Sequence, residues 1–261
     1  MDETTSVGES VLTDSPAEPD RACRQPRGRP RRPLWQQTVV LFAVAVVLAI
    51  VIKALFLQAF YIPSSSMEPG LVKNDRILVE KPSYWFGGSP QRGDVVVFKD
   101  PGDWLGAAED DAPHGALAAL MAKAGLYPSG GHLVKRVIGV AGDVIRCCDA
   151  RGRIMVNGTP LNESDYISPQ QTCNGPMTNT CSWTAGPVPD GHIFVMGDNR
   201  NNSADSTVHM CADSDPGCVP GDEYVDTDLV VGRVLALLWP RDRFTILHRP
   251  ATFARVKDAV E

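Results

Sequence analysis

The chain has 261 residues, 43% of them hydrophobic, and a formal net charge of −6. This length and apolar content are enough for one or two globular units with a core. The mild acidity argues against a nucleic-acid-binding surface, which would need clustered basic residues on the folded part. The 23 glycines and 21 prolines fall mostly after residue 60 and indicate many turns. A β-rich body is therefore favoured over a helical bundle.

Residues 1–36 form a polar tail in two parts. The first part, to about Asp20, is acidic and has little apolar surface to bury, which predicts disorder. The second part holds six arginines and no acidic residue: Arg21, Arg24, Arg27, Arg29, Arg31 and Arg32. Such a run could be a nucleic-acid-binding arm, but an apolar segment follows it. The positive-inside rule explains that order better and predicts a cytoplasmic N-terminus.

Val39 to Leu57 is apolar except for Lys53. As an α-helix this run would be about 28 Å long, close to the hydrocarbon thickness of a bilayer. The long aliphatic stem of Lys53 lets its amine reach the outer interface. A cleaved signal peptide ending near Ala59 is the rival interpretation, but it has a poor A-x-A cleavage site. We therefore expect one transmembrane anchor over residues 37–60 and an extracytoplasmic domain over residues 61–261.

Six runs with β-branched centres, bounded by turn residues, predict strands in this domain. They are residues 76–81, 94–99, 132–140, 153–156, 192–196 and 229–238. The expected fold is mainly β, an antiparallel sheet with a smaller β- and loop-rich insertion over about residues 146–190. Residues 100–131 read as an irregular insert with one short helix near 116–124, and no function is assigned to it.

The seven cysteines are divided by the apolar run. Cys23 precedes it, and six follow it: Cys147, Cys148, Cys173, Cys181, Cys211 and Cys218. An even set on one side indicates disulfides in an oxidising compartment. Zinc is the competing reading, but the CxxC-type spacing it favours is absent. Six cysteines allow 15 pairings, and the nearest non-adjacent pairs, Cys173–Cys181 and Cys211–Cys218, are the expected bonds.

Three segments carry candidate chemistry. Ser66 lies in a serine-rich stretch after the apolar run, Lys135 lies inside an apolar strand, and residues 197–206 form a loop rich in Asp, Asn and Arg. Each also has an ordinary reading: a polar linker, a lysine that points to water, and a surface loop. If Lys135 points inward, desolvation lowers its pKa, and the neutral amine could take a proton from a serine hydroxyl. No G-x-S-x-G or H-E-x-x-H motif offers an alternative catalytic centre.

Taken together, four segments resemble the conserved motifs of bacterial type I signal peptidases, in the same order and behind one anchor. The resemblance covers about residues 36 to 240. The segments are Ser64-x-Ser66-Met67-x-Pro69, Gly93-Asp94-Val95-Val96-Val97-Phe98, Lys135-Arg136-Val137-Ile138-Gly139 and Gly197-Asp198-Asn199-Arg200.

The resemblance implies a role for each matching residue. Ser66 would be the nucleophile and Lys135 the general base, with Ser64 donating to the oxyanion and Ser203 orienting the lysine amine. The ion-pair network of the loop over residues 197–206 would comprise Asp198, Arg200 and Asp205. Substrate would bind as an added strand against shallow apolar pockets, lined by Ile62, Pro63, Met67, Leu71, Leu133 and Val134.

The implied activity is endoproteolytic removal of signal peptides from secretory preproteins at the outer face of the cytoplasmic membrane. Besides these preproteins and membrane lipid, the resemblance implies no nucleic acid, no organic cofactor and no metal. The chain departs from the family pattern at three positions. Thr207 stands where the family often has arginine, so one ion pair of the network is expected to be missing. Asn201 replaces a common aspartate and Gly70 a common threonine.

Two rival functions remain. A soluble Ser/Lys self-cleaving repressor shares the chemistry but needs a DNA-binding helix pair where this chain has an apolar run. A non-catalytic bitopic envelope protein would use its β domain only to bind partners. It predicts that Lys135 is exposed and far from Ser66.

Overall fold

The computed structural model describes residues 33–85, 87–102, 104–105, 131–168, 182–211 and 217–259. The chain divides into two compact units, Met1–Val44 and Ala45–Glu261, whose boundary falls within the first helix. Three expectations lie outside the described residues: the disordered tail, the short helix near 116–124 and the Cys173–Cys181 bond.

Helix α1 comprises Leu34–Phe56, and strand β1, Leu57–Tyr61, follows it directly. The anchor was expected to reach residue 60, but the helix ends four residues earlier. All five residues of β1 pair with β2 (Arg76–Glu80), and Phe60 is only 4% exposed, so the chain gains a ladder and a core contact by leaving the helix. Along α1, side chains from residue 35 to residue 51 are exposed. Among the described residues, no helix has the length and apolar character needed to cross a membrane.

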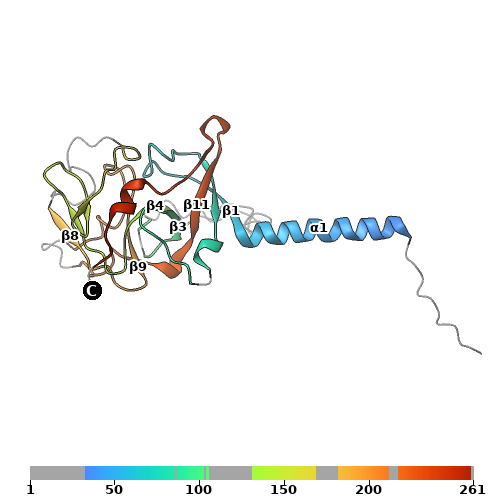
Figure 1. The fold of residues 1–261 in the computed structure, drawn as a ribbon, viewed down its shortest axis with the longest axis horizontal. Coiled ribbons are helices and arrows are strands. Elements are labelled where there is room, and N and C mark those ends of the chain that lie inside the picture. The colour runs from blue at the N-terminus through green and yellow to red at the C-terminus, as the bar shows by residue number, and fades with distance from the viewer. Residues whose placement is uncertain are drawn as a thin grey trace, which may run out of the picture. The chain divides into compact units, whose positions relative to one another are not determined.

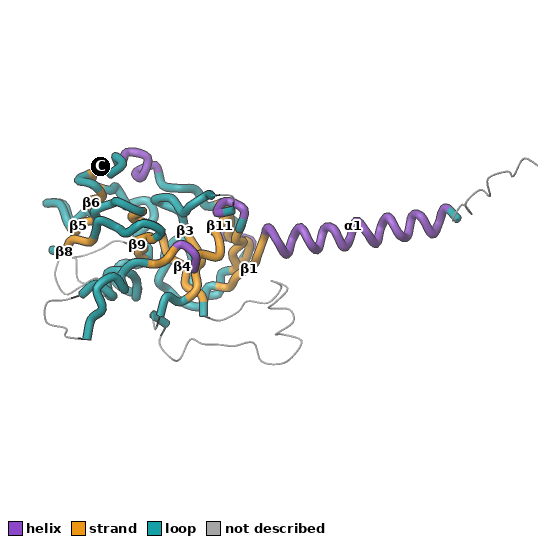
Figure 2. Tube along the Cα trace, turned by 90° about the horizontal axis from the view of Figure 1, so that it is seen from below, coloured by secondary structure: helices purple, strands orange, loops and turns teal. Residues whose placement is uncertain are grey.

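An antiparallel sheet forms the main part of the second unit (Figures 1 and 2). Its strands lie in the order β1-β2-β11-β3-β4-β9-β10, and β12 pairs with β11. The strands not yet defined are β3 (Val95–Lys99), β4 (His132–Val140), β9 (His192–Met196), β10 (Val225–Asp226), β11 (Val230–Trp239) and β12 (Thr245–Ile246). The predicted bounds of β4 and β9 are confirmed, and those of β2, β3 and β11 are confirmed to within one residue. The order places β11, late in the chain, between β2 and β3.

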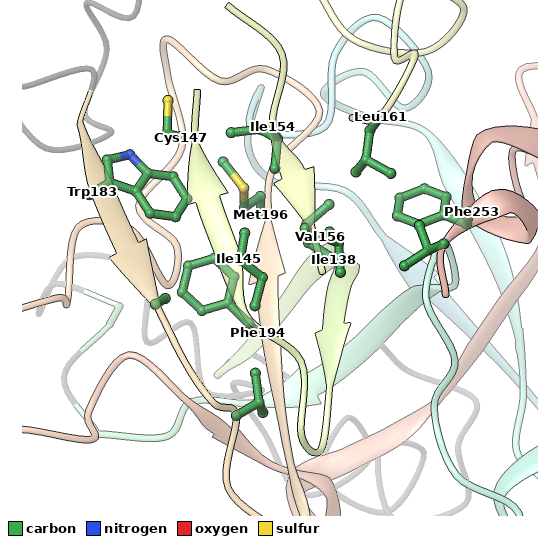
Figure 3. Packing of buried hydrophobic residues seen from close by; sticks show 13 residues of the cluster. Ile138, Ile145, Cys147, Ile154, Val156, Leu161, Trp183, Phe194, Met196 and Phe253 are labelled. Atoms are coloured by element: carbon green, nitrogen blue, oxygen red, sulfur yellow. The ribbon is translucent and has the colours of Figure 1, made fainter. Parts of the chain in front are cut away.

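A smaller antiparallel sheet occupies the region expected to hold the insertion. Its order is β7-β6-β5-β8, with bounds Thr159–Pro160, Met155–Val156, Ile145–Cys147 and Trp183–Ala185. Figure 3 shows how its side chains pack with those of the large sheet. Ile145 and Trp183 from the small sheet share one core cluster with Ile138, Phe194 and Met196 from β4 and β9. The two sheets are therefore held together by a common core.

The two faces of β4 contribute to different core clusters. Leu133 and Val137 pack in a cluster with Val96 and Trp104, whereas Val134 packs against another cluster that contains Phe60. This division follows from the two-residue period of a strand. Lys135 pairs with Val96 across the β3–β4 ladder, so its side chain projects into the face that holds Leu133 and Val137.

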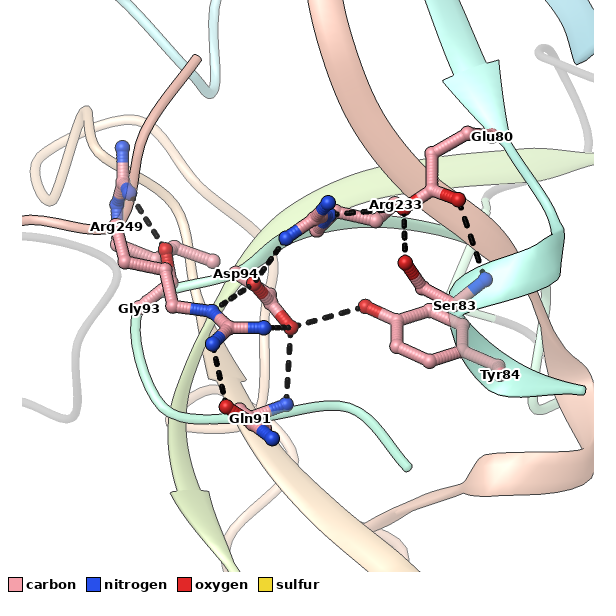
Figure 4. A network of polar contacts seen from close by, with 9 residues as sticks. Glu80, Ser83, Tyr84, Gln91, Gly93, Asp94, Arg233 and Arg249 are labelled. Carbon is pink, nitrogen blue, oxygen red and sulfur yellow. Dashed lines mark hydrogen bonds and ion pairs between the residues drawn. The ribbon is translucent and has the colours of Figure 1, made fainter. Parts of the chain in front are cut away.

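Short 3-10 turns follow several strands, at Pro82–Tyr84, Thr227–Leu229, Arg241–Arg243 and Ala251–Arg255. The buried carboxylate of Asp94 fastens the first of these to the C-terminal segment (Figure 4). It accepts hydrogen bonds from Arg249 Nε at 2.5 Å, the Tyr84 hydroxyl at 3.1 Å and the Gln91 amide at 3.0 Å. Burial, together with the Asp94 charge, raises the pKa of Tyr84, so its hydroxyl stays protonated and donates.

Two disulfides lie among the described residues. Cys211 and Cys218 are bonded, with Cα atoms 5.4 Å apart, which confirms that expected pair. Cys147 and Cys148 form a bond between sequence neighbours.

Candidate active site

The serine-rich stretch forms a loop directly after β1. Ser66 is buried, with 7% of the residue exposed, and its Oγ lies 3.2 Å from Ser64 Oγ. The loop that follows β9 holds it from the other side. The Asn199 amide donates to Ser66 O at 3.0 Å, and Asn202 Nδ2 donates to Ser65 Oγ at 2.7 Å. Segments more than 130 residues apart are thus joined by short polar contacts.

Lys135 is buried in the middle of β4, with 4% exposure. Its strand neighbours on the same face are Leu133 and Val137, and Val96 lies opposite. A fully buried lysine at such a place is rare in proteins. The hypothesis of a non-catalytic binding protein predicted an exposed Lys135, but the structure has this residue buried.

Ser66 and Lys135 line the same cleft, whose volume is about 180 Å³. Five of the six residues expected to bind substrate also line it: Ile62, Pro63, Met67, Leu133 and Val134. The sixth, Leu71, does not. It is 2% exposed and packs in the core cluster with Phe60. The cleft is also lined by residues that the sequence analysis did not single out, among them Trp104, Leu105 and His132.

Beside the cleft, Asp205 collects four hydrogen bonds on one buried carboxylate. Its Oδ2 accepts from the Ser203 hydroxyl at 2.6 Å and the Gly197 amide at 2.8 Å. Its Oδ1 accepts from the amide and the hydroxyl of Thr207, at 3.0 and 2.7 Å. Two hydroxyls and two amides therefore satisfy the carboxylate in place of the ion pair that was expected to be missing at Thr207. Thr207 replaces an ion pair by two hydrogen bonds.

Asp198 and Arg200 do not pair with each other. Arg136 forms a bidentate ion pair with Asp198, with N–O distances of 2.8 and 2.7 Å. Arg200 forms another with Glu163, with N–O distances of 3.0 and 2.5 Å. All four side chains are buried. Burial alone lowers the pKa of Arg200, but the neighbouring Glu163 carboxylate outweighs it and the pKa ends raised. Both guanidinium groups therefore remain charged and rigidly held.

Gly197 directly follows β9 and lies against the serine loop. A Cβ atom there would lie 2.3 Å from Ser203 Oγ and 2.5 Å from Ser66 O. Only glycine fits, because real Cβ atoms do not approach backbone oxygen so closely. Gly197 was recognised as part of a motif, but its role in letting the two loops meet is visible only in the structure.

Other members of the site gave weaker signals in the sequence. Arg136 follows Lys135 directly and belongs to the same motif, so its position was a usable clue. Glu163 lies 37 residues before Arg200 and carries no local pattern. Within the described ranges, no group of three or more His, Cys, Asp or Glu side chains is arranged to hold a metal ion.

Comparison with known proteins decides the family. Residues 35–239 match the family Signal peptidase, peptidase S26. The chain belongs to this family. It is 36% identical over 254 residues to a signal peptidase I of Mycobacterium tuberculosis (strain CDC 1551 / Oshkosh), which covers 90% of this chain and 83% of the relative. It is 33% identical over 238 residues to a signal peptidase I of Leptolyngbya laminosa, covering 91% and 94%. A crystal structure of a signal peptidase I from Enterococcus faecalis V583 matches with a TM-score of 0.28 and 21% identity, over 55% of this chain and 95% of that one.

As a member of the signal peptidase family, the chain is a serine endopeptidase. This excludes the non-catalytic binding protein as its main function. The family match begins at residue 35 and ends at residue 239, so it includes the serine loop, β4 and the loop after β9. Every residue that lines the cleft falls within it.

Proposed function

We propose that this chain is a signal peptidase I that cleaves N-terminal signal peptides from secretory preproteins, with Ser66 as nucleophile and Lys135 as general base. One observation carries the assignment of these two residues. Both side chains are buried, and both line a single cleft of about 180 Å³ in a member of the signal peptidase family. The names of the close relatives support the substrate class.

In this mechanism the neutral amine of Lys135 removes the proton of Ser66 Oγ as that oxygen attacks the scissile carbonyl carbon. A C–O bond forms, and the carbonyl oxygen becomes an oxyanion. The tetrahedral intermediate then collapses, the peptide C–N bond breaks, and the Lys135 ammonium returns the proton to the leaving amine. The signal peptide stays attached to Ser66 as an ester.

Water completes the reaction. Lys135 takes a proton from a water molecule that attacks the ester carbonyl, and Ser66 Oγ leaves with that proton. In both halves the oxyanion accepts hydrogen bonds from the Ser64 hydroxyl and the Ser66 amide. The contact of 3.2 Å between Ser64 Oγ and Ser66 Oγ supports this role, because it holds the Ser64 hydroxyl beside the reacting atom.

Ser203 orients the lysine in this proposal. The Ser203 hydroxyl donates a hydrogen bond to Asp205 Oδ2 at 2.6 Å. The lone pairs of Ser203 Oγ can therefore accept a hydrogen bond from the Lys135 amine. Asp205 is fully buried and held by Gly197 and Thr207 as well, which fixes the direction of the Ser203 hydroxyl.

The substrate binds as an extended strand along β4. Leu133 and Val134 pair with β3 on one side, while the described pairing of β4 with β9 begins only at Arg136. The backbone before Arg136 on the β9 side thus offers an edge for β-augmentation next to Ser66. The small cleft suits small side chains, as A-x-A cleavage sites supply.

The experiment is cleavage of a purified preprotein in detergent by the full chain and its variants. Ser66→Ala and Lys135→Ala should each lower kcat/KM by at least about 10³-fold, the scale seen when a nucleophile or its base is removed. Lys135→Arg should not restore activity, because arginine stays protonated. Lys99→Ala, an exposed lysine on the neighbouring strand β3, is the matched control and should cleave normally. Wild-type rates in folded Ser66→Ala protein would refute the assignment.

We also propose that residues 37–56 anchor the chain in the cytoplasmic membrane, with the residues before them in the cytoplasm. Residues 57–261, which begin with β1 and include the insertion at about 146–190, would lie outside. The support is the sequence: an apolar run with one lysine, preceded by six arginines and no acid. In cells, the full chain should stay in the membrane fraction at alkaline pH, and protease added to spheroplasts should digest the catalytic unit. Release of the chain by alkali, or protection from external protease, would contradict this topology.

A further inference from the structure

Trp104 lies at the start of the segment for which the sequence suggested no function. The Asp100 carboxylate fixes its backbone: Oδ1 accepts from the Trp104 amide at 3.0 Å, and Oδ2 accepts from the Leu105 amide at 3.1 Å. The indole is 6% exposed and lines the cleft with Ser66 and Lys135. The residue therefore belongs to a well-formed turn directly after β3, at the catalytic cleft.

The indole is held between two other rings. Phe98 meets it edge-on, with ring centroids 6.1 Å apart and planes at 88°. His209 stacks on it, with centroids 4.3 Å apart and planes at 6°. These are the two ring arrangements that aromatic pairs favour. The position and tilt of the indole are thus fixed by its neighbours.

His209 is itself attached to a fastened loop. It lies two residues before Cys211, which is bonded to Cys218. Thr207, two residues earlier, is tied to Asp205 through its amide and hydroxyl. His209 therefore stands between two fixed points, and the stack transmits that rigidity to Trp104.

The orientation of β4 determines what the indole can meet. Trp104 packs in the same cluster as Leu133, and Leu133 and Lys135 project from the same face of the strand. A substrate side chain that enters the cleft on this face, next to the bond that Ser66 attacks, would be stopped by the indole. The whole cleft that the indole lines has a volume of only about 180 Å³.

We propose that Trp104 sets the upper size limit of the substrate side chain accepted beside the scissile bond, and that His209 is the positioning residue that holds the indole in place. This inference rests on the proposed function, since it takes Ser66 as the point of cleavage. Trp104 contributes no proton and no charge to the reaction. It discriminates by occupying space that a larger side chain would need.

The test compares two substrates with one enzyme. Soluble peptides that differ only in the residue before the scissile bond, alanine or leucine, are cleaved by the full chain in detergent, and the ratio of the two kcat/KM values is measured. In Trp104→Ala the leucine-to-alanine ratio should rise at least tenfold over wild type. Because both substrates see the same preparation, a general loss of activity cancels in the ratio.

Trp104→Phe, which keeps an aromatic ring, should stay near the wild-type ratio. If Trp104→Ala fails to fold, Trp104→Leu preserves apolar burial and should shift the ratio in the same direction. Trp239→Ala is the matched control, because this exposed tryptophan on β11 is not among the residues that line the cleft. It should leave the ratio unchanged.

His209 is tested by removal and rescue. His209→Ala should raise the ratio in the same direction as Trp104→Ala but less, and His209→Phe should bring it back, since a phenyl ring restores the stack. Among the described residues, His209 Nε2 has no hydrogen-bond partner, so a phenyl ring gives up no described hydrogen bond at that atom. A merely structural role would change the rates for both peptides together.

An unchanged ratio in folded Trp104→Ala and Trp104→Leu, with Ser66→Ala inactive, would overturn this inference and leave the proposed function standing. Cleavage by Ser66→Ala at the wild-type rate would overturn the proposed function and the inference with it.

Discussion

The guanidinium of Arg200 and the carboxylate of Glu163 form a buried bidentate ion pair, with N–O distances of 3.0 and 2.5 Å. The pair joins the loop that follows β9 to the segment that follows β7 of the small sheet. Arg200 Nε also donates to Gly197 O at 2.9 Å, so the same side chain fixes the backbone beside Ser66 and Ser203. The pair is therefore a structural support of the catalytic loop.

Removing one partner of this pair should be costly. Glu163→Gln leaves the Arg200 charge buried without a counter-ion, and we expect a loss of about 3–5 kcal/mol in the free energy of unfolding. Urea unfolding of the full chain in detergent, followed by circular dichroism, measures it. The control is Asp258→Asn. Asp258 pairs with Arg92, and its side chain is 96% exposed. A surface pair of this kind contributes little, so its midpoint should stay within error. Equal midpoints for both variants would contradict the role of Glu163.

Gly197→Ala should damage both stability and activity. The new Cβ would lie 2.3 Å from Ser203 Oγ and 2.5 Å from the backbone oxygen of Ser66, so one of the two loops must move. Overpacking of this kind costs about 1–3 kcal/mol, and displacement of Ser66 should lower kcat/KM by at least about 10²-fold. Gly70→Ala is the matched control, since its Cβ would meet nothing closer than 3.7 Å. Near-wild-type kcat/KM in Gly197→Ala would show that the loops do not need this close approach.

Ser64→Ala should separate transition-state stabilisation from substrate binding. If the Ser64 hydroxyl donates to the oxyanion, its removal should lower kcat by about 10²–10³-fold with little change in KM. Ser65→Ala, the adjacent serine whose hydroxyl accepts from Asn202, should change kcat by only a small factor. Steady-state kinetics on one preprotein decides between them. A drop confined to KM would assign Ser64 to substrate binding instead.

The free energy of unfolding should depend on pH through the imidazole of His209. Burial lowers the pKa of this imidazole below its ordinary value of 6.5, although the carboxylates Asp100, Asp205 and Asp222 act in the opposite direction. As the pH falls below 6.5, the unfolded chain therefore takes up the proton first, and the folded state loses stability relative to it. The urea midpoint of unfolding should decrease more between pH 8 and pH 5.5 for the wild type than for His209→Phe. An identical fall in both would show that the imidazole is not protected from protonation.

The sequence by itself determined the local elements and the reactive pair. Runs with β-branched centres, bounded by turn residues, predicted the bounds of β4 and β9, because strand preference and turn chemistry are properties of neighbouring residues. The motif around Ser66 and the lysine inside an apolar strand identified the chemistry through residue type and order. The Cys211–Cys218 bond followed from nearness along the chain.

The tertiary structure decided what depends on distant segments. Residues 57–61 have the composition of the preceding helix, yet they pair with β2 because a strand partner and a core position are available there. The partners of Asp198 and Arg200, and the stack of Trp104 on His209, join residues that share no local pattern. A side chain's pattern reports whether it is buried, but the partner it meets is fixed by the order and register of the whole sheet.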